Sequence, residues 1–258
     1  MLRTIRATQY VTALREGGSL PAIIEADDLG LYVVKFRGAG QGPLSLVAEL
    51  IAGEIGRTIG LNIPELVFIQ VDPALGRNEP DQDIRDLLCA SVGINLALDY
   101  LPGSAMFDPA AGDTADSSTA SLAVWFDAFT LNVDRTARNA NLLTWHNRPY
   151  FIDHGAALYF HHNWPDSNRF ATLPFTDVRH HILLPWAANL EQAAALASTR
   201  LNPTVLAEIL AEVPDDWLQR AHATAAEARA AYLNLLTRRL TASTIFTQEA
   251  ICARANLI

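Results

Sequence analysis

The spacing of apolar residues changes near residue 100, and this change constrains the fold more than any other feature of the chain. Before it, short runs rich in β-branched and aromatic residues alternate with turn residues, which is typical of strands. After it, longer stretches rich in alanine and leucine predict helices. The pattern predicts an α+β protein with a strand-rich lobe over 1–102 and a mostly helical lobe over 103–258, together one domain.

The expected elements follow from the same pattern. Strands are expected at 8–14, 22–26, 31–36, 63–72 and 94–103. Helices are expected at 44–60, 83–91, 119–132, 186–199, 203–212 and 215–240, and a hairpin joins "NLLTW" to "PYFID". Gly60 follows the first long helix, where a glycine often ends a helix in the left-handed conformation.

Composition excludes several classes of protein. The formal net charge is −9, and nonspecific nucleic-acid binding needs a basic surface. Every apolar run is far shorter than the roughly 20 residues of a membrane span, and the first residues lack the pattern of a secretory signal. Cys89 and Cys252 have neither metal-binding nor disulfide-framework spacing. These features predict a cytoplasmic protein without a direct nucleic-acid or membrane partner.

Lys35 is the only lysine beside 18 arginines, and it lies in the apolar run "LYVVKF". A lysine that points into a core or cleft needs an anionic partner, because an unpaired buried charge is too costly. Its compact ammonium fits a narrow site facing a phosphate or a carboxylate better than the broad guanidinium of arginine does. The alternative is an exposed lysine at a strand edge.

Two further short motifs contain candidate functional residues. In "NVDRTARNANLL", Asp134 is followed five residues later by Asn139, between a predicted helix and a predicted strand. In "YFIDHGAAL", Asp153 ends a strand and precedes His154 and Gly155. Each motif alone is common by chance. Together with a preceding glycine turn, a strand lysine and a helix with glutamates, their order matches the phosphoryl-transfer arrangement of kinases.

In this order the motifs resemble the HipA-like kinases and, more distantly, the phosphoinositide and protein kinases. The residues that carry the resemblance are "GGS", "YVVKF", "ELIAGEIGRTIGLNIPE", "LDYLPG", "NVDRTARNANLL" and "YFIDHGAAL", over residues 8–160. The resemblance implies a bilobal protein kinase-like fold that uses ATP and Mg²⁺. It also implies that the chain begins near the kinase core, without the extra N-terminal domain of HipA toxins.

The resemblance also implies a role for each matched position. Lys35 would hold the α- and β-phosphates of ATP, with Glu49 as its ion-pair partner. Asp134 would orient the accepting hydroxyl and take its proton, and Asn139 and Asp153 would bind Mg²⁺. The remaining nucleotide-binding residues would be Gly17, Gly18 and Ser19 over the phosphates, Arg138 near the γ-phosphate, and Asp99, Tyr100 and Leu101 at the adenine.

Several residue assignments stay open at this point. A helical wheel puts Glu54, rather than Glu49, on the apolar side of its helix, so Glu54 is the alternative partner of Lys35. Ser19 could be autophosphorylated or only form a turn. Arg138 could be a simple loop arginine. Asp127, in an apolar helix, is interpreted as structural, holding backbone N–H groups of the loop that follows.

The predicted function is a kinase that transfers the γ-phosphoryl group of ATP to a hydroxyl, expected on a protein serine or threonine. A small-molecule kinase of the aminoglycoside or lipid-kinase type and a non-catalytic nucleotide-binding module are the alternatives. An antitoxin-like regulator is a possible partner. The pairs His161–His162 and His180–His181 lack the spacing of a zinc site and are interpreted as polar loop residues.

Overall fold

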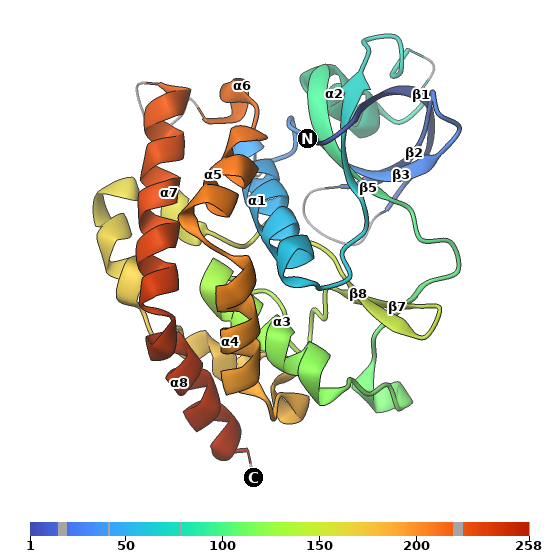
Figure 1. The fold of residues 1–258 in the computed structure, drawn as a ribbon. Coiled ribbons are helices and arrows are strands. Elements are labelled where there is room, and N and C mark those ends of the chain that lie inside the picture. The colour runs from blue at the N-terminus through green and yellow to red at the C-terminus, as the bar shows by residue number, and fades with distance from the viewer. Residues whose placement is uncertain (15–19, 41, 78, 219–223, 258) are drawn as a thin grey trace.

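A computed structural model describes residues 1–14, 20–40, 42–77, 79–218 and 224–257 (Figure 1). Five strands of the first hundred residues close a barrel in the order β1-β2-β3-β5-β4. The strands are β1 (Thr4–Ala13), β2 (Ala22–Ala26), β3 (Leu31–Lys35), β4 (Leu66–Val71) and β5 (Gly93–Asp99). All five were predicted, although β1 begins earlier and β5 ends four residues earlier than the sequence suggested.

The barrel closes through a long-range pairing that local sequence pattern does not reveal. β1 pairs with β2 in an antiparallel manner and with β4 in a parallel manner, through partners such as Ile5 and Ile69. Alternate strand residues point inward, so the barrel has its own apolar core. This core contains Ile5, Ile24, Tyr32, Val34, Phe36, Val67, Ile69, Val71, Leu88 and Ala97, among others.

The helix α1 (Pro43–Ile59) lies between the barrel and the helical half of the molecule (Figure 1). It begins with a proline, whose missing N–H costs nothing there, and ends at Gly60, whose φ of 101° lies in the left-handed region. Its buried residues share one large core with the helical half, and it contacts α4, α5 and α6 as well as β4 and β5. The helix is therefore buried on more than one side.

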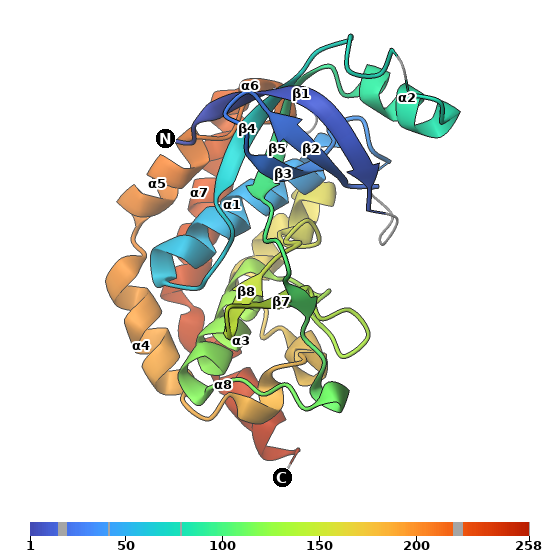
Figure 2. The same ribbon diagram turned by 90° about the vertical axis from the view of Figure 1, so that its right-hand side faces the viewer.

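The helical half surrounds α3 (Ser117–Thr130), which is buried along nearly its whole length. The predicted hairpin is β7 (Leu142–Trp145) and β8 (Arg148–Phe151), which the short β6 (Ala105–Met106) joins to form a three-stranded sheet. The chain descends from β5 to this sheet beneath the barrel (Figure 2). The other helices are α2 (Gln82–Ala90), α4 (Leu190–Arg200), α5 (Pro203–Ala211), α6 (Asp215–Leu218), α7 (Ala225–Thr241) and α8 (Ser243–Ala255).

Two helix predictions in this half were wrong, and one helix was missed. The helix expected over 215–240 is split into α6 and α7, and Thr224 caps α7 in a capping box with Glu227. The C-terminal helix α8 was not predicted. The helix expected from residue 186 begins at Leu190, because a run of short 3₁₀ turns occupies 159–186. The division into lobes at residue 102 stays a prediction.

No helix in the described part of the chain combines the length and the apolar character that a membrane span requires.

Candidate active site

Lys35 lies at the end of β3, with its ammonium between two carboxylates. Its Nζ lies 2.5 Å from Oε2 of Glu49 on α1 and 2.5 Å from Oδ1 of Asp153 after β8. The side chain of Glu49 is fully buried, whereas that of Asp153 is 46% exposed. The structure thus joins three residues that are up to 118 positions apart in the sequence.

The protonation of this cluster follows from burial and charge. Burial disfavours the charged form of Lys35 and lowers its pKa. The negative charges of Glu49 and then Asp153 have the larger combined effect, so the pKa of Lys35 is raised. Burial raises the pKa of Glu49, and the positive charge of Lys35 offsets only part of this increase. The pKa of Asp153 is lowered, chiefly by Lys35. The cluster therefore holds a charged lysine against at least one charged carboxylate.

Glu54, the alternative partner, does not reach Lys35. Its carboxylate lies 3.6 Å from Nε of Arg57, one turn along the same helix. The ion pair of Lys35 forms with Glu49.

Asp134 lies in the loop that follows α3, called here the Asp134 loop (residues 131–141). Its Oδ2 accepts hydrogen bonds from the side-chain amides of Asn139, at 2.8 Å, and Asn141, at 3.2 Å. Thr136 and Asn139 exchange backbone hydrogen bonds and close the turn between them. The half-exposed carboxylate is held through one oxygen, which leaves Oδ1 for another partner.

The Asp153 loop (residues 152–155) lies directly against the Asp134 loop. The backbone N–H of Ile152 donates to the carbonyl of Asn141 at 3.1 Å. Asp153 itself has a φ of 56°, an uncommon left-handed conformation for a residue with a side chain. Asn141 therefore contacts both loops, through its side chain and its carbonyl. Lys35, Glu49 and Asp153 form one cluster, and the backbone hydrogen bond from Ile152 to Asn141 links this cluster to Asp134 and Asn139.

A buried ion pair beneath the two loops was missed by the sequence analysis. Asp127 on α3 accepts from Nε of Arg135 at 2.6 Å, from the side-chain amide of Asn132 at 3.0 Å and from Nε2 of His181 at 2.9 Å. It binds side chains, so the expectation that its carboxylate holds backbone N–H groups was wrong. Burial alone would raise the pKa of Asp127. The charge of Arg135 and the hydrogen bond from His181 have the larger effect, so the pKa of Asp127 is lowered.

His154 occupies the position after Asp153 and is also fully buried. Nη2 of Arg135 lies 3.2 Å from its Nδ1, so the ring accepts at Nδ1 because an arginine can only donate. The ring of Phe126 meets it edge-on at 5.5 Å between ring centroids. Burial, and then the charge of Arg135, lower the pKa of His154 to about 3. The residue is a neutral imidazole at physiological pH.

The three residues predicted to meet the adenine lie at the end of β5. The backbone N–H groups of Asp99 and Tyr100 donate to the carbonyls of Glu65 and Leu31, at 2.9 and 3.0 Å. Of the three N–H groups, only that of Leu101 is not engaged by a backbone carbonyl of the described residues. An adenine at this edge would therefore find one backbone donor, on Leu101.

Other predicted residues have different outcomes. Gly17, Gly18 and Ser19 lie outside the described residues. Arg138 is exposed in the turn of the Asp134 loop. His161 is buried, with Nδ1 2.8 Å from the hydroxyl of Tyr232. Within the described ranges, no group of three or more His, Cys, Asp or Glu side chains is placed to hold a metal ion.

Mg²⁺ at a kinase site takes one or two protein oxygens and completes its shell with water and phosphate. Asp153 fits such a site, because only Oδ1 contacts Lys35 and the side chain is partly exposed. Asn139 fits as well, because it donates its amide N–H to Asp134 and retains its amide oxygen as a ligand. Asn139 and Asp153 thus have oxygens that would hold Mg²⁺, which would supply positive charge at the phosphates.

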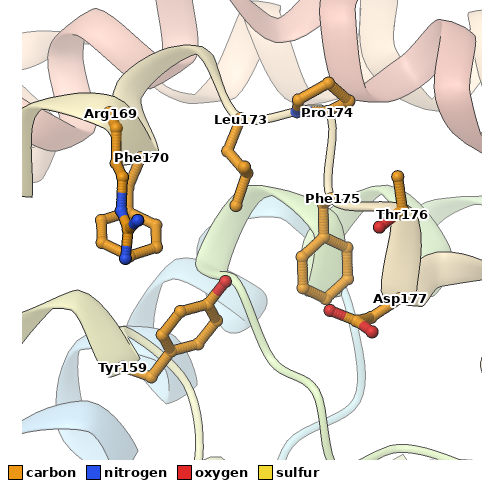
Figure 3. A pocket seen from close by; sticks show the side chains of 8 residues that line it. All are labelled: Tyr159, Arg169, Phe170, Leu173, Pro174, Phe175, Thr176 and Asp177. Carbon is orange, nitrogen blue, oxygen red and sulfur yellow. The ribbon is translucent and has the colours of Figure 1, made fainter.

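A cavity of about 300 Å³ lies in the helical half, in the segment that connects the Asp153 loop to His181. The hydroxyl of Tyr159 points into it between Arg169 and Asp177 (Figure 3). The lining residues are Tyr159, Arg169, Phe170, Leu173, Pro174, Phe175, Thr176 and Asp177. Among the predicted site residues that the structure describes, none lines this cavity.

Two solved structures with a similar fold are kinases. The Helicobacter pylori proinflammatory kinase CtkA is 12% identical, with a TM-score of 0.61 over 97% of this chain and 99% of that chain. The Golgi casein kinase, solved with Mn and ADP bound, is 11% identical, with a TM-score of 0.50 over 96% of this chain and 73% of that chain. At this level of identity the likeness establishes the fold, which is that of a kinase.

The family follows from the sequence itself. A family model described as HipA-like kinase matches residues 8–246, and the chain belongs to the HipA-like kinases. The resemblance stated from the motifs is thereby confirmed. A comparison with curated protein sequences finds no match.

Proposed function

We propose that this kinase transfers the γ-phosphoryl group of ATP to a hydroxyl of a protein serine or threonine. The observation that carries the proposal is the network that joins Lys35, Glu49 and Asp153 by direct contact and connects them to Asp134 through Asn141. Phosphoryl transfer depends mainly on positioning and on neutralising charge, and this network supplies fixed groups of both signs.

Each residue has a distinct task in this proposal. Lys35 binds the α- and β-phosphates, and Glu49 holds its ammonium in place. Asn139 and Asp153 hold Mg²⁺, which neutralises phosphate charge when bound. Arg138 faces the γ-phosphate, and the role of Gly17, Gly18 and Ser19 at the phosphates remains part of the proposal, since these residues lie outside the described ranges. At the adenine, the N–H of Leu101 is the donor, and Asp99 and Tyr100 belong to the same backbone segment.

Asp134 receives the proton in the transfer step. The Oδ2 atom of Asp134 is occupied by two amides, so its Oδ1 accepts the hydrogen bond of the attacking hydroxyl. As the hydroxyl oxygen bonds to the γ-phosphorus, the bond from that phosphorus to the β–γ bridging oxygen breaks, and ADP leaves. The hydroxyl proton passes to Asp134.

The protein acceptor, the compartment and the regulator complete the proposal. A protein acceptor is supported by the likeness to the Golgi casein kinase, whose name gives a protein substrate. Free Cys89 and Cys252 agree with a reducing cytoplasm. The barrel and the helical half act as the two lobes of a kinase around the nucleotide. An antitoxin-like protein would regulate the enzyme.

The test uses labelled ATP and Mg²⁺ with the wild-type chain and with Asp134→Ala. We expect label on the protein itself or on added casein, reduced at least about a thousandfold in the variant. ADP-induced stabilisation should persist in Asp134→Ala, because Asp134 faces the acceptor. Transfer only to an added metabolite would replace the protein acceptor by a small molecule. Nucleotide binding without transfer under any condition would refute catalysis.

A further inference from the structure

Arg135 follows Asp134 directly, and its guanidinium is buried beneath both loops of the site. Its Nε donates to Asp127 on α3 at 2.6 Å. Its Nη1 donates to the carbonyl of Asn141, and its Nη2 lies 3.2 Å from Nδ1 of His154. The side chains of Arg135 and Asp127 are both fully buried. One planar group thus contacts α3, the Asp134 loop and the Asp153 loop.

These contacts connect the backbone beside Asp134 to the backbone beside Asp153. Arg135 is the covalent neighbour of Asp134, and His154 is the covalent neighbour of Asp153. The contact between Arg135 and His154 therefore sets the separation of the loops one residue away from each carboxylate. A second contact, from Nη1 to the carbonyl of Asn141, holds the same carbonyl that accepts the N–H of Ile152.

We propose that Arg135 is a positioning residue that fixes Asp134 and Asp153 relative to each other by donating to Asp127, Asn141 and His154. This inference rests on the proposed function. The guanidinium of Arg135 is fully buried and all its contacts are with protein groups. It acts through the loops, and groups that orient ligating residues commonly change metal affinity or activity by about 10- to 100-fold when removed.

A purely structural role is the competing explanation, and the chain contains a matched control for it. Arg239 on α7 is also fully buried, and its guanidinium donates to the carbonyls of Ala128, Phe129 and Phe170. It contacts none of the proposed site residues. Arg239→Lys and Arg135→Lys both keep the charge and lose the planar fork, so both should lower the melting temperature.

The two variants should differ in their response to magnesium. The probe is ADP, whose binding is measured by calorimetry over a range of Mg²⁺ concentrations in wild type, Arg135→Lys and Arg239→Lys. We expect Arg135→Lys to need about 10-fold more Mg²⁺ for half-maximal ADP binding. Its kcat should fall by at least about the same factor, with a smaller change in KM for ATP. Arg239→Lys should keep the Mg²⁺ requirement of the wild type.

His154 tests the same contact from its other side. Asparagine can place an acceptor oxygen near the position of Nδ1, whereas leucine leaves the donor of Arg135 without a partner. We expect His154→Leu to match the Mg²⁺ requirement of Arg135→Lys, and His154→Asn to restore at least half of the difference on a logarithmic scale. Equal values for the two His154 variants would overturn the inference.

Two further outcomes separate this inference from the proposed function. A wild-type Mg²⁺ requirement in Arg135→Lys, with a melting temperature lowered as in Arg239→Lys, would show that Arg135 is only structural. The proposed function would then stand. If the wild-type chain bound no ADP at any Mg²⁺ concentration, the proposed function would fail and the positioning role with it.

Discussion

Replacing Lys35 by methionine tests the electrostatics at the centre of the proposed site. Methionine keeps an unbranched side chain and removes the charge. In the wild type, one ammonium lies 2.5 Å from the carboxylates of both Glu49 and Asp153. The variant leaves these two like charges facing each other, and we expect a loss of unfolding free energy at neutral pH.

The structure bounds the size of this loss. Each oxygen lies 2.5 Å from the same nitrogen, so the two oxygens are at most about 5 Å apart. At an effective dielectric constant of about 20, two unit charges at that distance repel by about 3 kcal/mol. Asp153 is 46% exposed, so solvent screening reduces the repulsion to about 2 kcal/mol. Because about 5 Å is the largest possible separation, we expect Lys35→Met to lose at least about 2 kcal/mol at pH 7.

The stability deficit of Lys35→Met should also depend on pH, in a direction that the pKa of Glu49 determines. Burial already raises the pKa of Glu49 above its ordinary 4.5, and losing Lys35 raises it further. A group whose pKa is higher in the folded state than in the unfolded state stabilises the fold at pH values below its unfolded-state pKa. This stabilisation is lost as the pH rises through its folded-state pKa. The deficit of Lys35→Met should thus shrink between about pH 7 and pH 5.

Urea denaturation at both pH values measures the deficit. The matched control is Lys35→Met combined with Glu49→Gln, which removes the repulsion and should recover at least half of the loss at neutral pH. An equal deficit at both pH values, or a double variant as unstable as the single one, would refute this electrostatic account.

Two further predictions concern stability alone. Asp127→Asn should cost about 3–5 kcal/mol at pH 7, because it leaves the buried charge of Arg135 uncompensated. The folded-state pKa of Asp127 is lowered below its ordinary 3.8, so its stabilisation is present above that value and is lost only as the pH falls toward the folded pKa. Chemical denaturation should show the deficit of Asp127→Asn unchanged between about pH 8 and pH 5, and a strong decline within that range would contradict it. Gly60→Ala should lower the unfolding free energy by about 1–2 kcal/mol, because φ is 101° there and a methyl group would displace Arg200 from the carbonyl of Ile59. Gly40→Ala, where no atom of the described residues lies within 4 Å of the added carbon, is the control and should be nearly neutral in thermal unfolding.

The sequence predicted the local parts of the site well. Alternation identified β3 and hence Lys35, and the turn residues of "HNR" identified the hairpin that ends at the Asp153 loop. The helical wheel of α1 favoured Glu54 because it assumes one apolar face, whereas the spacing to "GLNIP" supported Glu49, the partner that was assigned and that the structure shows. α1 is covered on more than one side, so the face of Glu49 is as buried as the opposite one.

Long-range contacts account for what the sequence did not reveal. The pairing of β1 with β4 and the convergence of Arg135, His154 and His181 on one region join residues that share no local pattern. One signal was available for the ion pair. Asp127 lies in a helix that is apolar all round, so its charge required a buried partner, and Arg135 is eight residues away.

The shared core of α1 and the helical half has a consequence for any opening of the molecule. Leu66, Leu96 and Leu98 of the barrel strands share the core of α1, whereas the interior of the barrel has a core of its own, so we expect any opening to be a rotation of the barrel against α1 and the helices that cover it. Such a rotation would draw Lys35 away from both Glu49 and Asp153 at once, because the amine moves with the barrel and both acids remain behind. The ion pair between Lys35 on β3 and Glu49 on α1 would then form only in the closed arrangement of barrel and helices.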